Sequence, residues 1–104
     1  MEYQVEQTEQ NSDTNLTPET RFAYAVYLLV LNSGVMTEHG ALLPEGLNMP
    51  KLSRQAEISL NFALKQGATL RRQGFIKNRK EDGRIVVSVT ELENYLTENG
   101  VILD

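Results

Sequence analysis

Five polar side chains recur at short spacing in the second half of the chain, and their chemistry is that of hydrogen bonding. A single helix would carry most of them on one side, because residues three or four apart share a helical face. Amide and guanidinium groups form paired hydrogen bonds with the edges of nucleic-acid bases, and cationic groups attract phosphates. The spacing therefore indicates a helix that presents these groups outward: Asn61, Lys65, Gln66, Thr69 and Arg72.

A second group of cations lies on both sides of an Asp-Gly pair, Asp82 and Gly83. Such a pair between two strand-like runs, here residues 75–80 and 84–89, is a strong signal for a β-hairpin. Cations on a protruding hairpin would lie along phosphates or enter a minor groove, where they add affinity with little sequence information. Together with two residues near the start of the polar helix, they complete the predicted DNA contacts: Arg54, Ser59, Lys77, Arg79, Lys80 and Arg84.

The charge is distributed unevenly along the 104 residues, whose formal net charge is −4. Residues 51–84 hold nine of the ten basic residues and only three acidic ones, which gives this segment a net charge of +6. Residues 1–17, 18–50 and 85–104 carry −4, −2 and −4. A polyanion responds to the local field rather than to the sum of charges, so double-stranded DNA is the predicted partner.

Catalytic and metal-binding chemistry finds little support in the sequence. The chain has no cysteine, which excludes disulfides, thiolate zinc sites and cysteine nucleophiles, and its single histidine, His39, cannot form a histidine-rich metal site alone. No nucleophile with a neighbouring base, pair of acids or phosphate-binding glycine loop is recognisable. We therefore expect no enzymatic activity, no metal and no cofactor, and a small-molecule effector is not evident.

One small globular domain fits a chain of 11.7 kDa with 40% hydrophobic residues. Residues 1–16 are rich in polar and acidic side chains and are predicted to be a disordered acidic tail, whereas residues 17–104 form the domain. The longest apolar run, residues 22–31, is too short to span a bilayer, and the N-terminus lacks the basic start of a signal peptide. The expected location is the cytoplasm, at the nucleoid when bound to DNA, with no membrane partner.

The first predicted helix has both a clear start and an unusual centre. Thr17 is suited to cap it, Pro18 fits its first position, and the helix is expected to end near Asn32, before Gly34. Its centre, residues 22–31, is apolar all the way round and must be covered on more than one side. A second copy of the chain could provide that cover. The sequence therefore predicts a homodimer with these interface residues: Tyr24, Tyr27, Leu28 and Leu31.

The segments that lead to the polar helix are shorter and less regular. Residues 34–50 contain three glycines and two prolines and are predicted to form a connecting loop, with a short extended piece near residues 41–43. Residues 51–57 favour a short helix. Ser59 is suited to cap the polar helix of residues 60–73, whose inward face is predicted to consist of Leu60, Ala63, Leu64, Gly67 and Leu70.

A last helix is predicted after the hairpin. Residues 90–93, Thr-Glu-Leu-Glu, match a capping box that would start this helix, and Asn99-Gly100 would end it. Leu92, Tyr95 and Leu96 are expected to face inward. The order of elements is then helix, loop, short helix, capped helix, basic hairpin and helix, which is the layout of a winged helix-turn-helix domain.

The residues of this stretch support that layout. Residues 52–59, Leu-Ser-Arg-Gln-Ala-Glu-Ile-Ser, followed by residues 60–70, resemble the helix-turn-helix of the MarR and GntR classes of bacterial regulators. Residues 70–90 are similar to the pattern of leucine, polar residues, glycine, isoleucine, charged wing, Asp-Gly-Arg and valine-rich strand in those families. The sequence departs from the pattern at Glu57, where glycine is usual, and at Gly67, where leucine is common.

The resemblance implies an α+β winged helix-turn-helix fold, with about four helices and a two- or three-stranded β-hairpin wing, and the DNA-binding mode of those regulators. The expected function is sequence-specific binding of double-stranded DNA by a homodimer, as a small transcriptional repressor or a plasmid or phage accessory factor. Two alternatives stay open. One is a winged-helix module that docks another protein, and the other is an excisionase-like factor that bends DNA.

Overall fold

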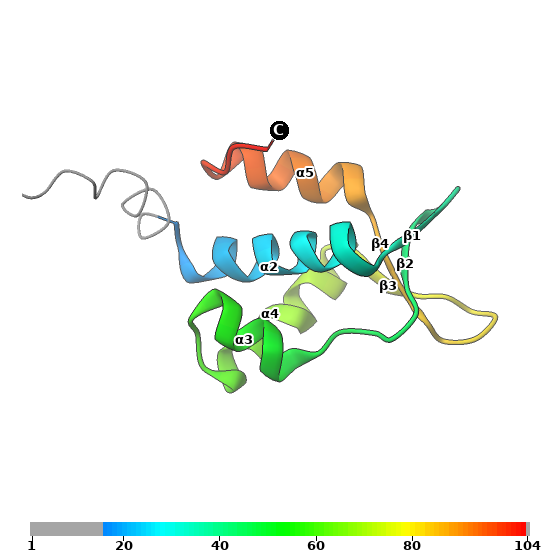
Figure 1. The fold of residues 1–104 in the computed structure, drawn as a ribbon, viewed down its shortest axis with the longest axis horizontal. Helices are drawn as coiled ribbons and strands as arrows, with labels where there is room; N and C mark the ends of the chain where they lie inside the picture. Colours follow the sequence, from blue (N-terminus) through cyan, green and yellow to red (C-terminus); the bar gives the residue numbers. More distant parts are fainter. Residues whose placement is uncertain (1–15, 104) are drawn as a thin grey trace, which may run out of the picture.

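Four helices and a four-stranded sheet are formed by residues 16–103, the part of the chain that this computed structural model describes (Figure 1). The expected acidic tail therefore lies outside the described residues except for Leu16, which packs against the core. The elements follow in this order: α2 (Pro18–Ser33), β1 (Val35–Thr37), β2 (Gly40–Leu43), α3 (Met49–Ala56), α4 (Leu60–Arg72), β3 (Ile76–Asn78), β4 (Ile85–Val87) and α5 (Val89–Glu98).

Helix α2 begins where the sequence predicts. The Thr17 hydroxyl oxygen accepts a hydrogen bond from the backbone N–H of Thr20 at 3.1 Å, and Pro18 occupies the first turn. The helix ends before Gly34, whose backbone is extended and not left-handed. A Cβ atom at Gly34 would lie 2.6 Å from the carbonyl oxygen of Val30, so close approach of the backbone is the reason for glycine here.

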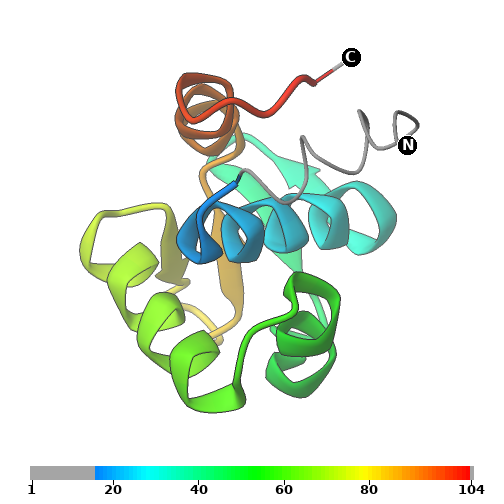
Figure 2. The same cartoon turned by 90° about the vertical axis from the view of Figure 1, so that its left-hand side faces the viewer.

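The apolar centre of α2 is covered by the chain itself. The helix lies between α5 on one side and the pair α3 and α4 on the other (Figures 1 and 2), and it also contacts strand β2. Phe22, Ala23 and Val26 are completely buried there. The chain itself therefore covers most of this apolar centre, whereas Leu28 and Leu29 are half-buried and Leu31 is exposed.

The sheet has the strand order β1-β2-β4-β3, with antiparallel neighbours. The extended piece predicted near residues 41–43 is confirmed as β2, but the rest of the predicted connecting loop is wrong at residues 35–37, which form β1. The β1-β2 hairpin adds two strands to the hairpin of β3 and β4. Gly40 makes this possible: its φ is +131°, and a Cβ atom there would lie 2.5 Å from the carbonyl oxygen of Val87 on β4. The same glycine that suggested a loop therefore allows β2 to approach β4.

Helix α5 begins one residue before the predicted capping box. Ser88 occupies the cap position, but its hydroxyl donates to the carbonyl of Gly74 at 3.3 Å, and Thr90 is exposed in the first turn. The backbone N–H of Ser88 donates to the carbonyl of Phe75 at 2.9 Å, which holds the start of α5 against the beginning of the wing. The helix is anchored by the buried Leu92 and Leu96, as predicted.

Candidate nucleic-acid interface

The turn between α3 and α4 has the local chemistry of a helix-turn-helix. The Asn48 side chain caps α3 by accepting from the N–H of Lys51 at 3.0 Å, so this helix begins two residues before the predicted start. It ends at Ala56, and the next residue, Glu57, is left-handed with a φ of +59° and a ψ of +48°. The Ser59 hydroxyl then caps α4 by accepting from the N–H of Phe62 at 3.1 Å, as predicted.

Arg21 of α2 holds the end of α3 in place. Its Nε donates to the carbonyl oxygen of Ala56 at 2.8 Å, and its Nη1 donates to the carbonyl oxygen of Leu16 at 3.0 Å. The last carbonyls of a helix lack hydrogen-bond donors within the helix. Arg21 donates to one of these carbonyls, that of Ala56. Sequence reasoning missed this role, because it depends on a contact between residues 35 positions apart.

The polar face of α4 points away from the core, as the spacing predicts. Ala63, Gly67 and Leu70 are buried against the core, whereas Asn61, Lys65 and Arg72 are exposed. The other two predicted contact residues, Gln66 and Thr69, are half-buried at the edges of the outward face.

Arg72 is held by a neighbour on the outward face of α4. Its Nη2 donates to the Thr69 hydroxyl oxygen at 3.0 Å, and that hydroxyl donates in turn to the carbonyl oxygen of Lys65 at 3.1 Å. These contacts orient the guanidinium on the surface of the helix, so Thr69 positions Arg72.

Two leucines of α4 contradict the predicted inward face. Leu60 and Leu64 are 45% and 50% exposed. A helix turns about 100° per residue, so these residues lie to one side of the buried positions and not among them. Gly67 is a close-packing position: an added Cβ atom would lie 3.2 Å from the Met49 methyl group.

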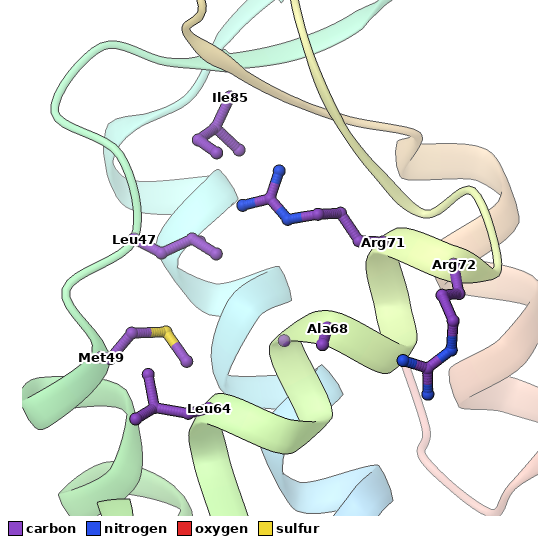
Figure 3. Close-up of a pocket in the computed structure, with 8 residues that line it drawn as sticks. Leu47, Met49, Leu64, Ala68, Arg71, Arg72 and Ile85 are labelled. Carbon is purple, nitrogen blue, oxygen red and sulfur yellow. The ribbon is translucent and has the colours of Figure 1, made fainter. Parts of the chain in front are cut away.

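An open groove of about 540 Å³ runs along this side of α4 (Figure 3). The Arg71 side chain extends toward Ile85 across the groove, whereas Arg72 points away from it. The groove combines apolar walls with a cationic rim, and it is lined by Leu47, Met49, Leu64, Gly67, Ala68, Arg71, Arg72 and Ile85.

The predicted wing is present, with shorter strands than expected. β3 and β4 are joined by residues 79–84, and a backbone hydrogen bond of 2.7 Å from the N–H of Arg79 to the carbonyl of Arg84 closes this connection. Gly83 has a φ of +72° and supplies the left-handed residue of this loop. The turn at Asp82-Gly83 is where the sequence predicts it, but the connection is longer than the three residues, 81–83, left between the predicted strand runs.

Two of the four wing cations are bound to the wing's own carboxylate. Asp82 accepts from Nε and Nη2 of Arg79 at 3.2 and 2.6 Å, and it lies 3.5 Å from Nε of Arg84. The hydrogen bonds from Arg79 and from the Arg84 backbone lower the pKa of Asp82 to about 2. Lys77 and Lys80 are exposed, and neither forms an ion pair with any residue between 16 and 103.

The wing is tied to α4 by a chain of side-chain hydrogen bonds. Arg71, at the end of α4, donates to the side-chain oxygen of Asn78 on β3. The amide nitrogen of Asn78 donates to the carbonyl of Gly83 in the wing loop at 2.8 Å. Arg71 and Asn78 were not among the predicted DNA contacts. Their hydrogen bonds fix the orientation of the wing relative to α4.

The charges are separated across the molecule. The cations of α4 and of the wing lie on elements that contact each other, and the exposed Arg54 is on the last turn of α3 next to α4. Glu91, Glu93 and Glu98 lie on α5, on the other side of α2 (Figure 1). The predicted basic residues therefore lie on adjoining elements, although exposed acidic residues of the same segment offset part of their charge: Glu57, Glu81 and Asp82.

No protein-family model matches this sequence, and no curated protein matches it. The structure is similar to that of a CRP/FNR-family transcriptional regulator from Thermus thermophilus, with a TM-score of 0.66 and 17% identity, over 86% of this chain and 45% of the regulator. The fold is a winged helix-turn-helix. A CRP-family transcriptional regulator from the same organism gives a TM-score of 0.63 and 16% identity, over 91% of this chain and 48% of the other.

The winged-helix fold also matches CooA from Carboxydothermus hydrogenoformans, a CO-dependent transcription factor, with a TM-score of 0.58 and 14% identity. That match covers 75% of this chain and 36% of CooA. The chain thus spans less than half the length of these regulators. The two Thermus thermophilus regulators are described as CRP/FNR or CRP family proteins. The expected winged-helix fold is therefore found, whereas the resemblance of this chain to the MarR and GntR classes stays a likeness of residues 52–90.

The predicted dimer residues have different environments. Tyr27 is only 8% exposed, and its hydroxyl donates to a carboxylate oxygen of Glu93 at 2.8 Å, so it serves the core of the chain itself. This hydrogen bond raises the pKa of Tyr27. Tyr24 and Leu28 are half-buried, and Leu31 is 63% exposed. The sequence prediction missed two further exposed apolar residues on the edge strand β1: Val35 and Met36.

Residues outside this interface show little that indicates other chemistry. His39 is exposed, and its Nε2 lies 3.6 Å from a carboxylate oxygen of Glu38. Among residues 16–103, no group of three or more potential metal ligands gathers. None of the helices formed by these residues is both long and apolar enough to cross a membrane.

Proposed function

We propose that this chain binds double-stranded DNA sequence-specifically, as a transcriptional regulator, with α4 in the major groove and the wing on the backbone. The observation that carries the proposal is the outward face of α4, where Asn61, Lys65 and Arg72 are exposed beside a basic wing. The major groove accommodates one helix. The similarity to transcriptional regulators supports the same reading.

Each side chain on α4 has a chemical role in this proposal. Asn61 and Gln66 have the paired donor and acceptor that match the major-groove edge of adenine, and Arg72 matches that of guanine. Thr69 keeps Arg72 in position through the 3.0 Å hydrogen bond. Lys65, Arg54 and Ser59 are assigned to phosphates and to polar contacts at the rim of the groove.

The wing adds affinity and little sequence information. Lys77 and Lys80 are assigned to phosphates, because they are exposed and unpaired among residues 16–103. Arg79 and Arg84 contribute less, since Asp82 already neutralises part of their charge. The wing is therefore proposed to bind the DNA phosphates weakly, mainly through Lys77 and Lys80.

Two copies are proposed to bind a pseudo-palindrome, with half-site centres about 34–36 Å apart. The second copy is expected to contact the exposed apolar side chains at the end of α2 and on β1, of which Leu31 was predicted from the sequence. An exposed edge strand such as β1 favours pairing with another chain. Repression, or an accessory role in plasmid or phage biology, follows if such binding blocks another protein from the same DNA.

Selection from random duplexes, followed by titration at several salt concentrations, tests this function. The logarithm of the association constant should fall linearly with the logarithm of the salt concentration, with a slope of about −0.9 for each phosphate neutralised. Lys65→Ala combined with Arg72→Ala should abolish sequence preference and weaken binding. Glu91→Gln combined with Glu98→Gln, on α5, is the control and should leave the preference for the selected sequence unchanged. Affinity independent of salt, or of the α4 substitutions, would contradict the proposal.

A further inference from the structure

An apolar stripe runs along the exposed side of α4, next to its polar face. Leu60, Leu64 and Ala68, called the leucine stripe below, follow each other at intervals of four residues and lie on one side of the helix. All three are exposed. The polar residues Asn61, Lys65 and Arg72 lie directly beside them.

Packing within the chain does not account for this stripe. The core side of α4 is already filled by Ala63, Gly67 and Leu70. Leu64 forms a wall of the groove shown in Figure 3, yet half of its side chain remains open to solvent. Single exposed leucines are common on protein surfaces, but two leucines on one helical stripe beside a polar recognition face form an apolar contact surface.

The cations around the leucine stripe favour a negatively charged partner. Lys65, Arg71 and Arg72 border it, and α4, all of which the structure describes, contains no acidic residue. The partner must therefore be negatively charged and must still present apolar groups at its surface. In the major groove of DNA, the C5-methyl group of thymine is such a group.

We propose that Leu60 and Leu64 contact thymine methyl groups and select thymine at one or two positions of each half-site. This inference rests on the proposed DNA binding and adds a specificity that the polar residues cannot supply. Asn61 lies one residue from Leu60, so the selected thymines are expected next to the base that Asn61 reads. Arg72 keeps its role at a guanine edge, and the exposed Arg71 is available to a phosphate beside the leucine stripe.

Replacing thymine by deoxyuridine tests the proposal, because it removes only the C5-methyl group and keeps every hydrogen-bonding group of the base. Each thymine of a selected duplex is replaced in turn, and binding by the full chain is measured by fluorescence anisotropy. Burial of one methyl group contributes about 0.8 kcal/mol, which corresponds to about fourfold in affinity. We expect one or two positions at which deoxyuridine weakens binding of the unaltered protein by about this factor.

Substitution of the leucines identifies which side chain reads which methyl group. Leu64→Ala should weaken binding to the thymine duplex and remove the effect of deoxyuridine at one position, and Leu60→Ala should do the same at another. Ile102→Ala is the matched control, because Ile102 is 87% exposed and lies far from α4 in the sequence. It should keep the full sensitivity to deoxyuridine. Circular dichroism checks that each variant is folded.

Three results would overturn the inference. The first is a selected site with no preferred thymine, and the second is a selected site in which deoxyuridine has no effect at any thymine. The third is sensitivity that Leu60→Ala and Leu64→Ala leave unchanged. In these cases specific DNA binding persists, so the proposed function stands and the leucine stripe serves another partner. If the unaltered protein binds no duplex sequence-specifically, both the proposed function and the contact of the leucines with thymine are overturned.

Discussion

Glu57 occupies the one left-handed position between α3 and α4 that favours glycine. For a residue with a Cβ atom, this conformation costs roughly 1–2 kcal/mol. We therefore expect Glu57→Gly to raise the free energy of unfolding by about 1 kcal/mol, measured by urea denaturation. Glu57→Ala keeps the Cβ atom and serves as the control. An equal gain from alanine and glycine would show that backbone strain is not the cause.

Asp82 is predicted to titrate far below an ordinary aspartate. Its pKa of about 2 arises mainly from the hydrogen bonds of Arg79. Because the folded-state pKa is depressed, the contribution of Asp82 to stability is complete above pH 3.8 and is lost as the pH falls toward 2. Carboxyl resonances of the wing, followed by NMR between pH 6 and pH 1.5, should show this midpoint. A midpoint near 3.8 would mean that the ion pair does not form in solution.

Removing the charge of Asp82 should strengthen DNA binding. Asp82→Asn releases Arg79 and Arg84 from their carboxylate, so both become available to phosphates. The slope of affinity against salt should become steeper by about 0.9 for each arginine that gains a phosphate. The Glu81→Gln variant removes the same charge without breaking a recorded ion pair and is the matched control. An equal change in both variants would assign the effect to net charge alone.

At the scale of elements, the buried end of α3 depends on Arg21. Replacing Arg21 by Met keeps much of the apolar stem and removes the donors to the carbonyls of Ala56 and Leu16. We expect a loss of about 1–3 kcal/mol in the free energy of unfolding, because those carbonyls lose a charged partner. Hydrogen exchange should also speed up at the end of α3. Unchanged stability would indicate that water replaces the guanidinium at no cost.

The helices with strong local signals were predictable, and the strands that depend on distant contacts were not. Thr17 and Ser59 each place a hydroxyl three residues before the N–H that it caps, so their helices could be located from the sequence. The β1-β2 hairpin has strands of three and four residues, which are too short to show alternation. Its position is set by pairing with β4, more than 40 residues further along the chain.

The exposed polar face of α4 was predicted from the spacing of polar residues, and the exposure of Leu60 and Leu64 beside it was not. A helical pattern indicates which residues share a face, and Leu60 and Leu64 were assigned to the core because leucine is usually buried. The core side of α4 is narrower than that pattern suggests, since Gly67 brings α4 close to Met49 of α3. Arg71 was missed for a similar reason, because its partner Asn78 is on the wing.

At the scale of the whole molecule, the exposed apolar residues Leu31 and Met36 predict self-association. They are 63% and 66% exposed at the end of α2 and on the edge strand β1. Leu31→Ser combined with Met36→Ser should shift the protein from dimer to monomer in sedimentation equilibrium and weaken binding to a palindrome more than to a half-site. Ile102→Ser is the control. A monomer at every concentration, before any substitution, would contradict this prediction.

The proposed DNA-binding face consists of the cations of α4 and the wing, on the side of α2 away from the acidic residues of α5. NMR titration of the labelled chain with a selected duplex tests this claim most directly, because it reports every backbone amide at once. The account predicts that amide signals of residues 59–72 and 77–84 shift on binding, whereas those of α5 stay in place. Shifts confined to α5 or to β1, or no shift with any duplex, would contradict it.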